Sequence, residues 1–306
     1  MTEEILIAGG GWRVQRFILP ALELVGLTAA HTTILRRNGE EIPDFKDVSV
    51  ISDLDKYDKQ PNRVINCLPA DVMLAKGTDL LSLFPNAIHF WDTPTSASFT
   101  NLLKSLRNPD YDKIISLEDF VKLPNLDCMT KATGDNTFKQ LHHFGIPVHF
   151  LSVVRMSLRN AGRNTALVRR KGAKIVAGHG IGMKPKKNPK KAEIIIKGSN
   201  GRCLDIFDLK THNDTQVRDQ LTRIVSDGQL IYQLNDENLS SYDLSPRLVA
   251  EFSKPVTRTQ VHELDKILAL TRILGESGNQ YRFKDSIADC LGQKMIKKVG
   301  FFILRN

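Results

Sequence analysis

Apolar residues follow two kinds of spacing over residues 4–106. Short continuous runs have the length of buried strands, and they stand at 4–8, 31–35, 48–51, 64–68 and 87–91. In segments between these runs, apolar residues recur every three or four positions, as on the buried face of a helix, at 17–25, 72–84 and 97–106. Strands that alternate with helices predict a doubly wound parallel sheet, the Rossmann arrangement, and Thr95 or Ser96 is expected to cap the last helix.

The pattern changes after about residue 120. Strand-like segments then follow one another with turns between them, at 149–156, 173–176, 193–197 and 202–209, which predicts a mostly antiparallel sheet. Helical spacing returns at 214–226, 257–274 and 284–298. We therefore expect two domains: a Rossmann dinucleotide-binding domain over 1–120, and an α+β substrate or oligomerisation domain with an open sheet over 121–306.

The first apolar run stops at a glycine turn, residues 9–11. In a strand-turn-helix unit the first glycine permits the tight turn, and the second lets the backbone approach a pyrophosphate at the positive end of the helix. Gly9 and Gly11 fit these positions, whereas Val14 stands where the usual motif has a third glycine. The alternative is a tight turn that binds no ligand. The residues expected to contact a dinucleotide here are Gly9, Gly11, Trp12, Arg13 and Val14.

Charge at the end of the second strand bears on the choice between NAD and NADP. An acidic residue about twenty positions after the turn would bind the ribose hydroxyls of NAD, while arginine there favours the extra phosphate of NADP. The strand ends in Arg36 and Arg37 without an acid, and Arg13 adds positive charge. The sequence therefore favours NADP over NAD. The alternative is that Arg36 and Arg37 are ordinary exposed loop residues.

Three segments carry a resemblance to the glucose-fructose oxidoreductase and inositol dehydrogenase family. Residues 5–22, ILIAGGGWRVQRFILPAL, are similar to the family's opening strand, turn and helix; 66–69, NCLP, resembles a strand end that lines the cofactor; and 89–94, HFWDTP, falls where the family has a strand ending in Glu-Lys-Pro. The resemblance implies NAD(P)-dependent oxidoreductase activity and a Rossmann domain followed by an open antiparallel sheet. The further cofactor contacts that it implies are Cys67, Leu68, Pro69, Asp92 and Pro94.

This chain departs from the family at its catalytic lysine, which corresponds to Thr93. Oxidation of an alcohol needs a base at the reacting oxygen, so a sugar or polyol dehydrogenase is disfavoured. Relatives that reduce imine or conjugated substrates use a less standard set of residues. A biosynthetic reductase of C=N or conjugated bonds is thus the leading hypothesis, with Thr93, acting through water, and Lys122 as candidate proton donors. The alternative is a dinucleotide-binding sensor or scaffold without redox turnover.

Composition narrows the classes of partner. The chain has a formal net charge of +9, and several lysines cluster at 184–191. No aromatic residues interleave with them, as a surface for single-stranded nucleic acid would require, so an exposed loop is expected instead. Arginines between 155 and 170 would favour an anionic small-molecule substrate if several line the site, and otherwise form a solvated face or an oligomer contact.

Cysteines and apolar segments bear on metals and on location. The four cysteines are widely spaced without a CxxC motif, so neither a metal site nor a disulfide framework is expected, and Cys67, inside an apolar run, is read as an inert thiol. No apolar stretch reaches the roughly 18 residues of a membrane helix, and residues 1–4 are acidic where a signal peptide is basic. We expect a cytoplasmic protein, and the family resemblance implies a homodimer or homotetramer.

Overall fold

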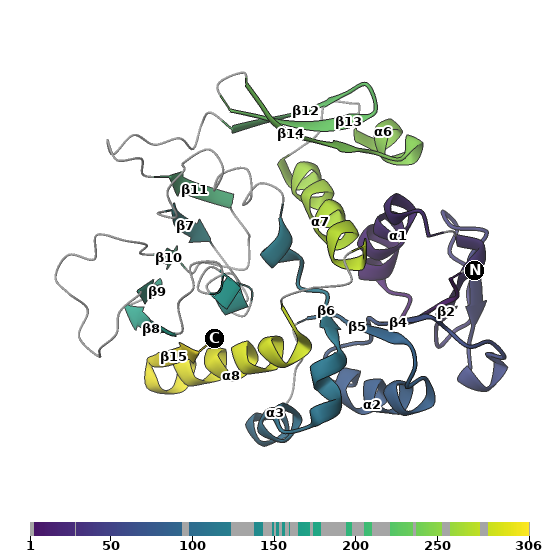
Figure 1. Cartoon of the computed structure of the whole chain (residues 1–306), viewed down its shortest axis with the longest axis horizontal. Coiled ribbons are helices and arrows are strands. Elements are labelled where there is room, and N and C mark those ends of the chain that lie inside the picture. The colour runs from purple at the N-terminus through teal and green to yellow at the C-terminus, as the bar shows by residue number, and fades with distance from the viewer. Residues whose placement is uncertain are drawn as a thin grey trace. The chain divides into compact units, whose positions relative to one another are not determined.

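The structure is a computed structural model, in which two compact units are described separately (Figure 1). Unit 1 comprises residues 1–119 and 262–287, and unit 2 comprises 120–261 and 288–306. The residues that the structure describes are 3–27, 29–93, 98–123, 138–142, 149, 151–152, 155–156, 159, 165–171, 174–178, 194–197, 205–209, 221–234, 237–252, 258–275 and 281–305.

A six-stranded parallel sheet forms the centre of unit 1. Its strands are β1 (Ile5–Ala8), β2 (Thr32–Leu35), β3 (Ser49–Ile51), β4 (Arg63–Asn66), β5 (Ile88–Trp91) and β6 (Ile115–Ser116). They lie in the order β3-β2-β1-β4-β5-β6, and each neighbouring pair is parallel. This confirms the predicted Rossmann sheet. The strand order reverses between β1 and β4, where such sheets bind their ligands.

The helices of the Rossmann part follow the predicted periodicity. A π-helical turn, η1 (Val14–Ile18), leads into α1 (Leu19–Val25), and α2 (Met73–Leu83) and α3 (Phe99–Leu106) follow later. Pro20 stands at the start of α1, where the wider turn before it accommodates a residue without an N–H donor. The cap of α3 is Ser98, whose Oγ accepts from the Asn101 N–H at 3.1 Å; the predicted caps fall within 94–97, outside the described residues.

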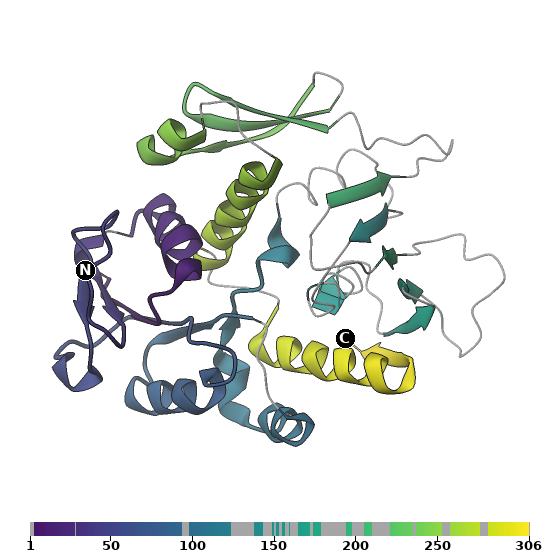
Figure 2. The same ribbon diagram turned by 180° about the vertical axis from the view of Figure 1, so that it is seen from behind.

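A C-terminal segment returns to unit 1, which the sequence pattern did not indicate. The segment holds most of α7 (Arg258–Gly275) and the start of α8 (Phe283–Val299), both predicted as helices. Arg16 donates to Glu263 at 2.7 Å, and α7 lies beside α1 in both views (Figures 1 and 2). The Phe283 ring packs edge-on against Trp91, with 4.8 Å between ring centroids. The unit that carries the Rossmann sheet is therefore built from both ends of the chain.

Unit 2 is mostly antiparallel, which confirms the predicted α+β class. One sheet has the order β10-β9-β8-β15, a second pairs β11 with β7, and a third has the order β12-β13-β14. Their bounds are β7 (Phe138–His142), β8 (Thr165–Lys171), β9 (Lys174–Gly178), β10 (Ile194–Lys197), β11 (Asp205–Leu209), β12 (Leu221–Ser226), β13 (Gln229–Leu234), β14 (Glu237–Asp243) and β15 (Phe301–Arg305). A short helix, α6 (Pro246–Phe252), follows β14.

Two predicted elements of the second half are wrong. The described residues within 149–156 are helical, because the buried positions Leu151, Ser152, Arg155 and Met156 repeat at a spacing of four and not of two. The helix predicted at 214–226 contains instead the strand β12, which forms a hairpin with β13. The signal was present: Asp227 and Gly228 both have positive φ, 51° and 78°, and Asp-Gly between apolar runs is typical of a tight hairpin turn.

No helix in the described part of the chain combines the length and the apolar character that a membrane span requires.

Candidate dinucleotide site

The glycine turn lies against the ends of three neighbouring strands. The Gly9 N–H donates to the Leu35 carbonyl at 3.0 Å, and the Cys67 N–H donates to the Ala8 carbonyl at 2.8 Å. Gly9 has a φ of +106°, and a Cβ added there would lie 2.6 Å from the Cys67 carbonyl oxygen. A glycine is therefore required at position 9, both for its backbone conformation and for the close approach of β4.

The residues at the end of the turn and just after it differ in burial: Gly11 and Trp12 are exposed, whereas Val14 is buried. A Cβ added at Gly11 meets no atom within 4 Å, so its backbone is accessible to a ligand. Trp12 is 65% exposed and packs edge-on against Phe17. Val14 is fully buried, and its N–H donates to the Gly11 carbonyl at 3.1 Å, so its side chain belongs to the core and only its main chain borders the turn.

Arg36 lies directly over the turn. A Cβ added at Gly10 would be 2.8 Å from the Arg36 Cδ, and the Arg36 guanidinium donates to the Glu40 carbonyl at 3.1 Å. The Arg36 N–H donates to the Ile51 carbonyl at 2.8 Å, which fixes the end of β2 beside β3. Arg37 is exposed. The structure thus brings the Arg36 side chain to the glycine turn, where the NADP hypothesis needs a cation.

Arg13 faces the ends of β5 and β6. Its guanidinium donates to Asp92 at 3.0 and 3.2 Å, to Asp119 at 2.8 Å and to the Leu117 carbonyl at 3.2 Å. Burial would lower the pKa of Arg13, but the attraction of Asp92 and Asp119 outweighs it and raises that pKa, so the guanidinium stays charged. Because two carboxylates share this cation, Arg13 is engaged within the protein, and Arg36 is the better candidate for selecting NADP.

The two carboxylates differ from ordinary exposed acids. Burial raises the pKa of Asp92, although Arg13 opposes the shift. The Asp92 N–H donates to the Asn66 carbonyl at 2.9 Å, which places this residue beside the end of β4. Asp119 is 2% exposed. Arg13, two residues after the glycine turn, thus joins the ends of β5 and β6 in a part-buried ion-pair network.

Thr93 has a partner that the sequence did not reveal. Its Oγ1 donates to Glu118 Oε2 at 3.0 Å, and Glu118 is 0% exposed. Both Glu118 and Asp119 follow β6, which has only two residues and gave no strand pattern in the sequence. The acidic pair after the apolar residues 114, 115 and 117 was the available signal.

The end of β4 carries the remaining predicted cofactor contacts. Cys67 and Leu68 are half-buried and Pro69 is exposed. The Leu68 N–H donates to the Asn66 side-chain oxygen at 3.3 Å, which shapes this loop. Burial raises the pKa of the Cys67 thiol well above its usual range, so Cys67 stays protonated and is a poor nucleophile, in line with the sequence interpretation.

Two further residues were predicted for the site, Pro94 and Lys122. Pro94 lies outside the described residues. Lys122 is half-buried at the end of the short helix η5 (Asp119–Lys122) and belongs to unit 2, whereas Thr93 belongs to unit 1. The roles of both stay predictions. Among the described residues, no cluster of three potential ligands could hold a metal ion.

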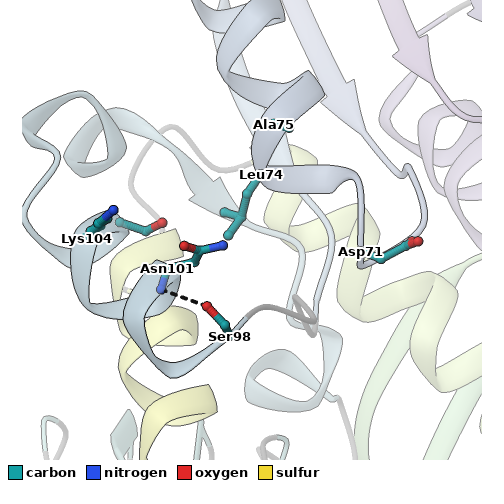
Figure 3. Close-up of a pocket in the computed structure, with 7 residues that line it drawn as sticks. Asp71, Leu74, Ala75, Ser98, Asn101 and Lys104 are labelled. Atoms are coloured by element: carbon teal, nitrogen blue, oxygen red, sulfur yellow. Dashed lines mark hydrogen bonds between the residues drawn. The ribbon is translucent and has the colours of Figure 1, made fainter.

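A separate cavity of about 450 Å³ opens between α2 and α3 (Figure 3). Its lining residues are Asp71, Leu74, Ala75, Ser98, Asn101, Lys104 and Ser105. In Figure 3 Leu74 and Asn101 point toward each other across it, and the Ser98–Asn101 hydrogen bond closes the start of α3. None of the predicted site residues lines this cavity.

Comparisons with known proteins bear on the fold. Neither protein-family models nor curated proteins match this chain. Among solved structures, a myo-inositol dehydrogenase from Corynebacterium glutamicum is 10% identical, with 100% of both chains covered and a TM-score of 0.60. A dehydrogenase from Clostridium difficile is 10% identical over 98% of this chain and 100% of its own, with a TM-score of 0.55.

A putative oxidoreductase from Bacillus subtilis is 16% identical, with 100% of both chains covered and a TM-score of 0.53. At these identities the likeness establishes the fold. The chain therefore has the two-domain fold of these dehydrogenases and of this oxidoreductase, as its resemblance to the glucose-fructose oxidoreductase and inositol dehydrogenase family implies.

Proposed function

We propose that this protein is an NADP-dependent oxidoreductase that reduces a C=N or conjugated bond of a small molecule in a biosynthetic pathway. The observation that carries the proposal is the glycine turn at the end of β1, whose Gly11 backbone is open while Arg36 covers Gly10. Such a turn lies at the point where a doubly wound sheet binds dinucleotides. The fold shared with dehydrogenases supports the same class of reaction.

The residues of the turn fit the phosphates of a dinucleotide. A pyrophosphate beside Gly11 would meet the amino end of the following helix, where backbone N–H groups and the helix dipole favour negative charge. Arg36, held between Gly10 and Glu40, would pair with the additional phosphate of NADP. Cys67, Leu68, Pro69 and Asp92 would border the nicotinamide end.

The substrate class follows from the residue at position 93. A threonine whose hydroxyl already donates to Glu118 is a weaker base than the family lysine, so removal of a proton from an alcohol is disfavoured. Reduction of a C=N bond asks only for hydride from the cofactor and one proton, which Thr93 or Lys122 would deliver. An anionic substrate, a homodimer or homotetramer and a cytoplasmic location remain predictions.

Fluorescence titration tests the cofactor. The chain has two tryptophans, Trp12, which is 65% exposed beside the turn, and Trp91, which is buried. NADPH should quench the Trp12 emission, and W12F should lose the quenching while calorimetry still detects binding. Absence of binding of both NADPH and NADH at millimolar concentration would overturn the proposal.

The replacement of the family lysine by Thr93 also favours a second function, a dinucleotide-binding sensor or scaffold without turnover. Stopped-flow absorbance of NADPH with a panel of cyclic imines and enones separates the two. Substrate-dependent loss of the reduced-nicotinamide band supports the reductase. Tight binding of NADPH with no loss of absorbance across the panel supports the sensor.

A further inference from the structure

The cavity between α2 and α3 is bordered by one face of each helix (Figure 3). The residues that line it recur every three or four positions, as residues on one face of a helix do. On the side of α3 they are Ser98, Asn101, Lys104 and Ser105, and on the side of α2 they are Asp71, Leu74 and Ala75. Its volume of about 450 Å³ falls within the range of ligand pockets, roughly 300 to 1,000 Å³. The cavity is therefore large enough for a small molecule.

The polar side chains of the cavity keep their hydrogen-bonding capacity for a ligand. Within the part of the chain that the structure describes, the side chains of Asp71, Asn101 and Lys104 form no hydrogen bond or ion pair. The Ser98 Oγ accepts from the Asn101 N–H at 3.1 Å, which leaves the serine hydroxyl proton available to donate. A ligand in the cavity would thus meet donors and an acceptor that the protein itself does not use.

Two opposite charges line the cavity without pairing with each other, Lys104 on α3 and Asp71 before α2. In Figure 3 their side chains lie on opposite sides of Leu74 and Asn101. Each charge attracts the opposite charge of a ligand, so a carboxylate is favoured beside Lys104 and an ammonium group beside Asp71. Leu74 and Ala75 contribute the apolar part of the lining, which an alkyl chain between the two charged groups would cover.

We infer that this cavity is a binding site for a small amphoteric molecule, in which an amine and a carboxylate are separated by a short apolar chain. The Asn101 amide and the Ser105 hydroxyl lie on the same helix face as Lys104, and they would donate hydrogen bonds to the carboxylate. Asp71 would hold the amine. The inference does not depend on the proposed function, because no residue assigned to the dinucleotide lines the cavity.

Titration with 6-aminohexanoate, followed by the backbone amide resonances of the full chain, tests the inference. The resonances of the residues that line the cavity should shift together, with a Kd of roughly 1 mM, as expected for a ligand of this size. Hexanoate and hexylamine serve as controls, because each keeps the alkyl chain and only one of the two charges. Both should bind roughly fivefold more weakly than 6-aminohexanoate or worse.

Two substitutions assign the two charged ends of the ligand. D71N should weaken 6-aminohexanoate roughly fivefold and leave hexanoate unchanged, whereas K104M should weaken both compounds. Matched controls come from Lys76 and Asp79, which pair with each other at 3.5 Å on α2 and do not line the cavity. K76M and D79N make the same changes of charge and should leave the affinity for 6-aminohexanoate as in the wild type.

Three results would overturn the inference. The first is the absence of shifts at the cavity with 6-aminohexanoate at tens of millimolar. The second is equal affinity for hexanoate and 6-aminohexanoate, which would show that the amine is not recognised. The third is an equal loss of affinity in D71N and D79N, or in K104M and K76M, since the effect would then reflect only the net charge of the surface. All four substituted side chains are exposed, so the variants are expected to fold, and thermal denaturation checks this.

Discussion

The two edges of the parallel sheet in unit 1 hold opposite arrangements of charge. At the carboxyl edge, one cation, Arg13, is shared by two carboxylates, Asp92 and Asp119. At the amino edge, one carboxylate, Glu4 before β1, is shared by two basic side chains, His31 at 3.1 Å and Lys59 at 2.9 Å. Both groups of ion pairs flank the same sheet, and they differ in how far their side chains are exposed to solvent.

The pKa values of the carboxylates at the two edges are shifted in opposite directions. The Lys59 hydrogen bond, with His31, lowers the pKa of Glu4 despite some burial, which is the behaviour of an ordinary stabilising ion pair. At the carboxyl edge burial raises the pKa of Asp92 even beside Arg13. Strained or pKa-shifted groups concentrate at functional sites, so the raised pKa of Asp92 supports the proposed dinucleotide site at the carboxyl edge, whereas the Glu4 pairs at the amino edge behave as stabilising contacts.

The strongest test of this comparison is G9A. The new Cβ would meet the Cys67 carbonyl oxygen at 2.6 Å in a backbone with φ of +106°, so we expect a loss of about 3 kcal/mol or more in the free energy of unfolding. NADPH binding should be lost as well. Urea denaturation and calorimetry measure the two effects.

Gly26 supplies the matched control for G9A. It also has a positive φ, +80°, but an added Cβ meets nothing within 4 Å. G26A should therefore cost only about 1 kcal/mol and leave NADPH binding intact. Equal costs for G9A and G26A would show that close packing at the carboxyl edge contributes nothing beyond backbone strain.

Removal of Arg13 should have the next largest effect. R13M leaves Asp92 and Asp119 part-buried without their cation, and we expect a loss of about 2 to 3 kcal/mol at pH 8. The pKa of Asp92, already raised by burial, would rise further, and a carboxyl whose pKa is higher in the folded state destabilises the fold as pH rises through that range. The loss in the free energy of unfolding caused by R13M should therefore be smaller at pH 5 than at pH 8.

R16M is the control for R13M, because the Arg16 side chain, which pairs with Glu263, is 35% exposed. Its expected cost is about 0.5 kcal/mol, with little change between pH 5 and pH 8. A cost for R16M as large as that for R13M would contradict the distinction between the carboxyl edge and more exposed ion pairs. Thermal denaturation at both pH values provides the measurement.

The sequence predicted the central strands of the parallel sheet well because most of their residues are buried. All of β1 is buried, and a continuous apolar run before glycines is typical of such a strand. The acidic partners of Arg13 and Thr93 were harder to find, since Asp119 and Glu118 lie about a hundred positions from the glycine turn and follow a strand of two residues. Periodicity describes local segments, and it does not reveal which distant loops meet at one edge.

Segment 262–287 illustrates the same limit. Its helices were predicted, yet their packing against the Rossmann sheet depends on contacts such as the Arg63 guanidinium with the Leu274 carbonyl, 2.5 Å apart. Neither residue belongs to a motif. By contrast, the Asp227-Gly228 turn could have been predicted, because its residue types alone favour a hairpin.

Substitution of Arg36 tests whether the carboxyl edge distinguishes NADPH from NADH. R36S should weaken NADPH about tenfold and leave NADH nearly unchanged, because Arg36, whose side-chain Cδ lies over Gly10, is the candidate partner of the additional phosphate. R37S removes a neighbouring exposed arginine and should affect both dinucleotides little. Equal losses for NADPH and NADH in R36S, measured by calorimetry, would instead assign Arg36 to the structure of the turn.

The smallest expected effect lies at the amino edge. E4Q should cost about 0.5 kcal/mol at pH 7, as expected for a partly exposed ion pair. Because the folded-state pKa of Glu4 is lowered, its stabilisation is present above the unfolded pKa of about 4.3 and is lost as pH falls through the folded value. The wild type and E4Q should therefore converge in stability below about pH 4, with NADPH affinity unchanged at neutral pH. A change in that affinity would mean that the two edges are coupled through the strands, and the division of function and stability between them would not hold.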